Sequence, residues 1–407
     1  MKKIAGGVTA AKGYEAAAAA AGIKYENRTD MALVYSVVPC KVAGTFTTNV
    51  VKAAPVQWDR QVVESKQPVQ AVVVNSGIAN ACTGKAGMQC CQETAEAAAK
   101  ALQIDPKGVL IGSTGVIGMP LPMEKLTAGI QILAAQKKAG EQAAKEAAKA
   151  IMTTDTCEKE VAVTVEIGGK TVTIGGMAKG SGMIHPNMCT MLAFLTTDAV
   201  ISRKALKEAL RTDVEETYNM ISVDGDTSTN DTVLLLANGM AENPKIKPGT
   251  REFELFAEAL HEVNGTLAKK MAGDGEGATA LFEVTVKGAK TKAQAKTLAK
   301  SVVCSNLTKT AIAGHDANWG RILCAMGYSG AEFDPEKVDL YLKSSAGELK
   351  LIENGVALNY SEVKATEILS QPEVTAIADI KEGDQTATAW GCDLTHGYIE
   401  INADYRS

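Results

Sequence analysis

The sequence predicts a mixed α/β protein of the layered α+β kind, with sheets sandwiched between helix layers and two domains. Apolar strand-like runs alternate with Ala-rich runs of helical spacing along the whole chain. Turn residues join several pairs of strand-like runs, which favours hairpins over an all-parallel sheet. The length of 407 residues exceeds the roughly 100–200 residues usual for one domain. A chain of this length can bury a sizeable core.

The strand predictions rest on short apolar runs, or runs of period two, that are bounded by turn residues. They fall at residues 70–75, 108–111, 160–167, 171–174, 191–197, 232–237, 282–286, 337–342 and 374–380. Gly168-Gly169 separates two alternating runs and therefore predicts a tight hairpin. The run at 108–111 leads into Gly112-Ser113-Thr114-Gly115, which we expect to follow the strand.

The helix predictions rest on apolar spacing of three to four residues among strong helix formers. They fall at residues 88–102, 123–152, 203–211, 252–271 and 293–302. The segment 123–152 is either one long helix or two helices joined near Gly140.

Composition excludes several classes of function. The net charge is −5 and basic residues form no run, so nucleic acid is not an expected partner. No segment approaches transmembrane length, so we expect a soluble, cytoplasmic protein without membrane contact. The nine cysteines are irregularly spaced and include no Cys-x-x-Cys, which indicates free thiols. The four histidines lack metal-site spacing, so we expect no metal.

The segment 177–199 holds the residues best suited to chemistry. Lys179-Gly180-Ser181-Gly182 indicates a flexible loop with one cation, and Pro186-Asn187 indicates a turn. Cys189-Thr190 then meets an apolar strand, where a hydroxyl is a plausible nucleophile. Taken alone, the same residues also fit a glycine-rich turn before a core strand whose Thr forms local hydrogen bonds.

The whole string Lys-Gly-Ser-Gly-Met-Ile-x-Pro-Asn-Met-x-Thr-Met-Leu-Ala-Phe resembles the self-cleavage signature of the ornithine acetyltransferase family, the bifunctional glutamate N-acetyltransferases. Further blocks that look like this family lie in order at residues 6–10, 43–49, 51–56, 75–77, 80–84, 222–231 and 318–321. The resemblance therefore extends along essentially the whole chain. Cys189 departs from the Ala that the family commonly has before its nucleophile.

The resemblance implies that the chain cuts itself between Cys189 and Thr190. An α chain of residues 1–189 and a β chain of residues 190–407 would remain together, as a dimer of α/β pairs, that is, a heterotetramer. Thr190 would be the nucleophile, and its freed α-amine would be the base. The ordinary pKa of such an amine, about 7.7–8.0, suits proton transfer near neutrality.

The resemblance also assigns the remaining site residues. It implies an oxyanion hole at Thr114 and Gly115, and substrate contacts from Thr190 and from Thr154, Lys179, Glu276, Asn402 and Ser407. Thr153 remains an alternative to Thr154, and Asp274 competes with Glu276 by chemistry alone. Without the resemblance, these positions also fit ordinary turns, solvated loops and a frayed chain end.

The activity implied is transfer of an acetyl group from N-acetylornithine to glutamate through acetyl-Thr190, in arginine biosynthesis. No bound cofactor is implied, and acetyl-CoA would be a co-substrate if the enzyme is bifunctional. One alternative is a self-processing amidase or aminopeptidase that hydrolyses the acyl-enzyme. Another is a non-catalytic binding protein that remains one uncut chain.

Overall fold

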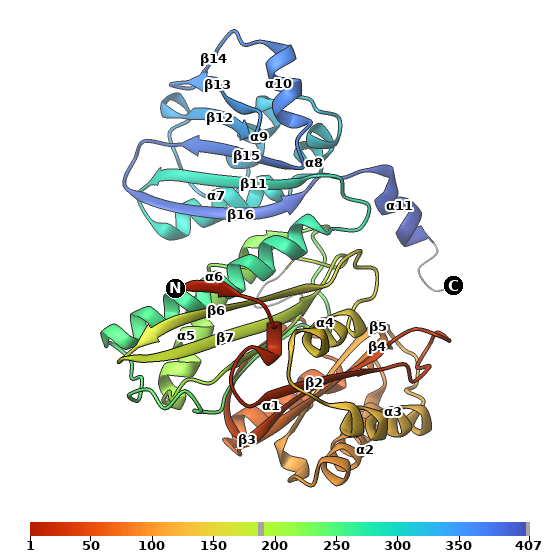
Figure 1. Cartoon of the computed structure of the whole chain (residues 1–407). Helices are drawn as coiled ribbons and strands as arrows, with labels where there is room; N and C mark the ends of the chain where they lie inside the picture. Colours follow the sequence, from red (N-terminus) through yellow and green to blue (C-terminus); the bar gives the residue numbers. More distant parts are fainter. Residues whose placement is uncertain (186–190, 404–407) are drawn as a thin grey trace. The chain divides into compact units, whose positions relative to one another are not determined.

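The computed structural model describes residues 1–185 and 191–403, which form two compact units (Figure 1). Of these residues, unit 1 holds 1–180, 191–219 and 227–267, and unit 2 holds 181–185, 220–226 and 268–403. Strands and helices occur in both units, which confirms the mixed α/β prediction. Each unit draws on residues from both sides of position 190, so the units are not the two chains expected from cleavage.

Unit 1 contains a mixed sheet of nine strands within the described residues. They are β1 (Lys2–Ile4), β2 (Tyr14–Ala19), β3 (Met31–Phe46), β4 (Val69–Ile78), β5 (Val109–Val116), β6 (Lys159–Ile167), β7 (Lys170–Lys179), β8 (Leu192–Thr197) and β10 (Thr232–Ala237). The long strand β3 joins two parts of this sheet. Its first half pairs with β2 and β4, and its second half pairs with β10.

Helices pack against both parts of this sheet. They are α1 (Ala54–Ser65), α2 (Gly84–Leu102), α3 (Met123–Gln136), α4 (Glu141–Ala150), α5 (Arg203–Val214) and α6 (Arg251–Gly273), whose last residues belong to unit 2. Apolar residues of α2 and α3 share one core cluster with β4 and β5. The opposite faces of β4 and β5 pack against β8 and β10 in a second cluster. Gly176 of β7 lies beneath Leu267 and Val263 of α6.

Strand β2 shows tertiary packing overriding local preference. Its sequence Tyr-Glu-Ala-Ala-Ala-Ala is rich in the best helix former, yet it pairs in register with β3. The small side chain of Ala16 shares a core with the alanines of α4, such as Ala144 and Ala148. Alanine therefore serves here to let a helix approach a strand closely.

Unit 2 is built on a separate mixed sheet of seven strands in the described part of the chain. They are β9 (Ile221–Ser222), β11 (Leu281–Ala289), β12 (Asp339–Ser344), β13 (Gly347–Glu353), β14 (Val356–Ala357), β15 (Glu373–Asp379) and β16 (Gln385–Cys392). Its helices are α7 (Lys292–Val303), α8 (Asn306–Ala313), α9 (Trp319–Gly327), α10 (Glu362–Leu369) and α11 (His396–Ala403). One continuous core joins α7, α9 and α10 to this sheet.

Most predicted elements are confirmed, including the hairpin of β6 and β7 around Gly168-Gly169. The segment 123–152 is two helices, which separate near Gly140. Two local predictions were wrong. The strand from residue 109 extends to Val116, so Thr114 and Gly115 lie within it rather than after it. Lys179 is the last residue of β7 and is buried, so it is not part of a flexible loop.

None of the helices formed by residues 1–185 and 191–403 has the length and apolar character needed to cross a bilayer.

Candidate active site

The predicted nucleophile, Thr190, and the other cleavage residue, Cys189, lie outside the described residues. Strands β7 and β8 precede and follow them in the sequence. Lys179, the last residue of β7, pairs with Leu192, the first residue of β8, in an antiparallel ladder. Paired Cα atoms in such a ladder are about 4.5–5.5 Å apart. Leu192, which lies two residues after position 190, is therefore directly beside Lys179.

A buried charge cluster surrounds Lys179. Its Nζ lies 3.9 Å from Oδ2 of Asp155, and the side chain is 9% exposed. Oδ1 of Asp155 accepts hydrogen bonds from Nζ of Lys159 at 2.7 Å and from the N–H of Gly180 at 2.7 Å. Burial alone would raise the pKa of Asp155, but Lys179 and Lys159 lower it to about 2. Asp155 is therefore ionised and fixes the end of β7.

Thr154 is joined to this cluster through its neighbours. The N–H of Thr153 donates to Oδ2 of Asp155 at 3.1 Å. The guanidinium of Arg28 donates to the carbonyls of Met152 and Thr153 at 2.7 and 2.9 Å. Both threonines are half-buried, so the choice between them remains open. Asp155 was not predicted from the sequence, although it belongs to the block that contains both threonines.

Thr114 and Gly115 lie at the end of β5, next to an irregular part of its pairing with β4. Gly115 has φ of +130°, and a Cβ there would overlap the backbone of Gly77. Only glycine fits this close approach. Thr114 is half-buried, so its hydroxyl group is not sealed in the core.

Asn230 connects this strand end to the start of β8. Its Nδ2 donates to the carbonyl of Ser113 at 2.8 Å and to that of Ala79 at 2.6 Å. Two residues later, Thr232 pairs with Leu192, and its N–H donates to the carbonyl of Met191 at 2.9 Å. The start of β8 thus has Lys179 on one side and, through Asn230, the Thr114 strand end on the other. Asn230 lies in the block 222–231, which resembles the family, but no role was predicted for it from the sequence.

Glu276 and Asn402 are in direct contact within unit 2. Nδ2 of Asn402 donates to Oε2 of Glu276 at 2.6 Å and to the carbonyl of Tyr398 at 3.0 Å. Glu276 is 7% exposed, so it is not a solvated loop carboxylate. A Cβ at Gly182 would overlap the carboxyl group of Glu276. The structure therefore places Glu276 against the segment that leads to the predicted cleavage position.

Helix α11 is held beside Glu276 by further contacts within unit 2. The hydroxyl of Thr395 donates to the carbonyl of Gly277 at 2.6 Å. The hydroxyl of Tyr398 donates to Oδ2 of Asp224 at 3.3 Å. The end of the chain is thus held against Glu276 as far as Asn402. Ser407 lies outside the described residues.

His185 is the last described residue before the gap at 186–190. Its Nδ1 lies 3.1 Å from Oγ of Ser222 and 3.5 Å from Sγ of Cys304. Burial, followed by the charge of Lys300, lowers the pKa of His185 to about 4. The imidazole is therefore neutral at pH 7. Sequence analysis considered this residue only as a metal ligand.

A buried lysine and a fixed strand end therefore flank the start of β8, the strand that follows the predicted nucleophile. Residues 15–407 match the model of the ArgJ family. The chain is 54% identical to the arginine biosynthesis bifunctional protein ArgJ of Symbiobacterium thermophilum, over 100% of both chains. The chain belongs to the ArgJ family.

Two solved structures match shorter parts of the chain. An ArgJ chain from Bacillus halodurans is 45% identical, with a TM-score of 0.50, and covers 53% of this chain and 99% of its own. An ornithine acetyltransferase from Mycobacterium tuberculosis, solved with ornithine, is 44% identical with a TM-score of 0.42. It covers 46% of this chain and 98% of its own.

Proposed function

We propose that this ArgJ-family enzyme transfers an acetyl group from N-acetylornithine to glutamate through an acetyl-Thr190 intermediate. Family membership over residues 15–407 supports a role in arginine biosynthesis, since the relatives are named as bifunctional proteins of that pathway. The signature around Thr190 supports the nucleophile. The observation that carries the proposal is the pairing of Lys179 with Leu192, which brings a buried cation beside the strand that begins just after Thr190.

The chain would cleave itself between Cys189 and Thr190, and both parts would stay in one sheet. Strand β8, from the later part, pairs with β7 from the earlier part, and β10 pairs with β3. The matched chain from Bacillus halodurans supports two separate chains. The match covers 99% of that chain but only 53% of this one. Residues 190–407, the expected β chain, are likewise a little over half of the 407 residues.

Two such α/β pairs would form a heterotetramer. Light scattering of the purified enzyme tests this assembly, because a single pair would give half the expected mass.

In the first half-reaction, the α-amine of Thr190 takes the proton of its own hydroxyl, and Oγ attacks the acetyl carbonyl of N-acetylornithine. The hydroxyl of Thr114 and the N–H of Gly115 would stabilise the oxyanion. Removing one such donor typically costs about 10²–10³ in rate. The protonated amine then gives its proton to the leaving nitrogen, which releases ornithine and leaves acetyl-Thr190.

In the second half-reaction, the amine of glutamate attacks the acetyl carbon and the bond from this carbon to Oγ of Thr190 breaks. The amine proton passes through the α-amine of Thr190 to Oγ, and N-acetylglutamate leaves. Lys179 would hold a substrate carboxylate, because its charge is only partly matched by Asp155 at 3.9 Å. Glu276, fixed by Asn402, would hold the ammonium end of ornithine. Thr154 and Ser407 would complete the substrate contacts.

Mass spectrometry of the denatured enzyme tests the proposal. We expect two fragments, the second beginning at Thr190 and gaining one acetyl group with N-acetylornithine. Thr190→Ala should remain a single chain without transfer activity, whereas Cys189→Ala should cleave and transfer normally.

An intact chain with full transfer activity would contradict the proposal. Free acetate formed at the rate of ornithine release, without N-acetylglutamate, would instead identify a hydrolase.

A further inference from the structure

The segment 181–185, which precedes the predicted cleavage position, belongs to unit 2, although the strands before and after it belong to unit 1. Lys179 ends β7 and pairs with Leu192 at the start of β8, so residues 180–191 connect two strand ends that lie side by side. A connection of this length that is fixed only at its ends would sample many conformations. Contacts within unit 2 instead hold its first part.

The carboxylate of Asp224 accepts hydrogen bonds from two successive residues of this segment. The N–H of Met183 donates to Oδ2 at 2.5 Å, and the N–H of Ile184 donates to Oδ1 at 2.9 Å. A carboxylate forms stronger hydrogen bonds to N–H groups than a neutral acceptor does. The N–H of Val223 returns the contact by donating to the carbonyl of Ile184 at 2.7 Å. We call Asp224 and its bonds to Met183 and Ile184 the Asp224 clamp.

Met183 has a backbone conformation that needs such support. Its φ of +54° lies in the left-handed region, which is uncommon for residues other than glycine. Its side chain is 42% exposed, so side-chain packing contributes little to holding this conformation. Strained residues persist only where their surroundings fix them, and they cluster at functional sites. Successive N–H groups that converge on one anion form such a fixed turn, and here the anion is Asp224.

The predicted scissile bond lies between two anchored residues. Before it, Nδ1 of His185 lies 3.1 Å from Oγ of Ser222. After it, the carbonyl of Met191 accepts the N–H of Thr232 at 2.9 Å. Attack within a chain requires the reacting atoms to be about 3–3.5 Å apart and aligned. The anchors therefore restrict which arrangements the residues at 189–190 can reach.

We propose that Asp224 is a positioning residue for self-cleavage, because its clamp directs the chain ahead of the scissile bond. The inference rests on the proposed function, since it requires cleavage before Thr190. In the attack, Oγ of Thr190 bonds to the carbonyl carbon of Cys189, the C–N bond between the two residues breaks, and the hydroxyl proton passes to the nitrogen. Water then hydrolyses the ester, which restores the hydroxyl and leaves Cys189 with a free carboxylate.

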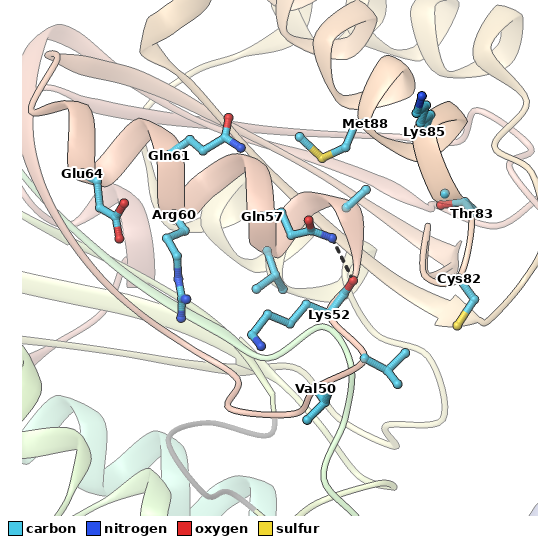
Figure 2. A pocket seen from close by; sticks show the side chains of 14 residues that line it. Val50, Lys52, Gln57, Arg60, Gln61, Glu64, Cys82, Thr83, Lys85 and Met88 are labelled. Carbon is cyan, nitrogen blue, oxygen red and sulfur yellow. Dashed lines mark hydrogen bonds between the residues drawn. The ribbon is translucent and has the colours of Figure 1, made fainter.

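The surroundings of Asp224 offer matched controls. Its carboxylate also accepts from the hydroxyl of Tyr398 at 3.3 Å and from the N–H of Asp226 at 3.2 Å. Tyr398→Phe removes only the first of these bonds, and Asp226→Ala removes a nearby exposed carboxylate while keeping its N–H. Glu64→Ala removes an exposed carboxylate on α1 in unit 1, where Glu64 lines a pocket of about 900 Å³ (Figure 2). All three variants leave the clamp intact.

Cell-free synthesis of the precursor, followed over time by denaturing gels and mass spectrometry, measures cleavage. We expect Asp224→Ala to cleave about hundredfold more slowly, as for misplacement of the reacting atoms by about 1 Å. Asp224→Asn keeps one acceptor oxygen and should cleave about tenfold more slowly. Tyr398→Phe, Asp226→Ala and Glu64→Ala should cleave at the rate of the wild type.

Urea unfolding in a Thr190→Ala background, where the chain stays uncut, separates positioning from stability. We expect the urea midpoint of Asp224→Asn to lie close to that of Tyr398→Phe, although only Asp224→Asn slows cleavage. Cleavage rates that follow the urea midpoints across all these variants would overturn the proposal, since Asp224 would then act only through stability.

Cleavage of Asp224→Ala and Asp224→Asn at the rate of the wild type would also overturn it, and the proposed function would stand. A wild-type precursor that does not cleave would instead contradict the proposed function, and this inference would fail with it.

Discussion

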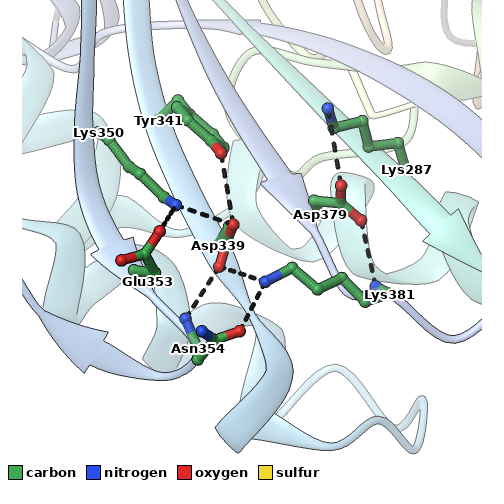
Figure 3. Close-up of polar contacts among 8 residues, drawn as sticks. All are labelled: Lys287, Asp339, Tyr341, Lys350, Glu353, Asn354, Asp379 and Lys381. Atoms are coloured by element: carbon green, nitrogen blue, oxygen red, sulfur yellow. Dashed lines mark hydrogen bonds and ion pairs between the residues drawn. The ribbon is translucent and has the colours of Figure 1, made fainter.

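Asp155 in unit 1 and Asp339 in unit 2 each contact two lysines, but they differ in burial. The side chains of Asp155 and Lys159 are fully buried. Around Asp339, Lys350 and Lys381 are 26% and 35% exposed (Figure 3). The same pair of residue types therefore occurs once in the core and once near the solvent.

The cluster around Asp339 joins β12, β13 and Lys381, which lies two residues after the end of β15. Asp339 accepts from Nζ of Lys381 at 2.6 Å and from the N–H of Asn354 at 2.9 Å, and it lies 3.0 Å from Nζ of Lys350. Burial alone would raise the pKa of Asp339, but Lys381, Asn354 and Lys350 hold it well below its usual range. This cluster holds strands together, whereas the cluster at Asp155 holds Lys179 beside the start of β8, where the transfer site is proposed.

The largest expected effect is on stability in unit 1. Asp155→Ala leaves Lys159 and Lys179 buried without their carboxylate, and breaking a buried pair costs about 3–5 kcal/mol. Urea unfolding followed by circular dichroism measures this change. Asp155→Asn, which keeps an acceptor for Gly180, should lose less. A change below about 1 kcal/mol in Asp155→Ala would show that the two lysines find other partners.

The pH dependence of stability should reveal the same group. The pKa of Asp155 is about 2 in the folded chain and 3.8 without structure, so the unfolded chain binds its proton first as the pH falls. The stabilisation is therefore complete above about pH 4 and is lost between about pH 4 and pH 2. In Asp155→Asn, the urea midpoint should fall less across this window. An unchanged slope would assign the acid sensitivity to other carboxylates.

Lys179→Met should separate catalysis from stability. We expect kcat/KM for acetyl transfer to fall about hundredfold, as for loss of a group that stabilises charge at the reacting centre. Stability should change less than in Asp155→Ala, because Asp155 keeps the hydrogen bonds from Lys159 and Gly180. Lys159→Met is the matched control, and it should lose more stability than Lys179→Met. An unchanged kcat/KM in Lys179→Met would show that this lysine takes no part in acetyl transfer.

The smallest effect is expected in unit 2. Asp339→Asn keeps an acceptor and affects lysines that water already reaches, so it should cost about 1 kcal/mol and leave transfer unchanged. The same urea titration measures the cost. A loss as large as that of Asp155→Ala would mean that exposure does not govern the difference between the two clusters.

The sequence predicted those helices and strands whose characteristic spacing and turn residues lie within one short segment. The hairpin of β6 and β7 follows from period-two alternation around Gly168-Gly169, since both belong to one short segment. Strand β2 gave no such signal, because its pairing with β3 and packing against α4 decide its conformation. Thr114 and Gly115 were predicted to follow the strand because polar and glycine residues usually end strands.

The site shows the same division. The role of Asp155 depends on Lys179, 24 residues away, and the contact of Glu276 with Asn402 spans 126 residues. No local pattern encodes such pairs, so Glu276 and Asn402 were each assigned only by resemblance to a family, their contact was not predicted, and Asp155 was missed. The structure places Lys179 and Glu276 in buried polar settings. Their roles, and those of Thr190 and Ser407, remain predictions.

Strand β8 lies between β7 and β10 in the sheet. After cleavage before Thr190, neighbouring strands in the middle of this sheet would therefore belong to two different polypeptides. Denaturation of the processed enzyme would then yield two separate molecules from each folded pair. Its apparent melting temperature would rise with protein concentration. Refolding after cleavage would require the two fragments to associate. Only the uncut precursor can therefore form this sheet by folding of one chain.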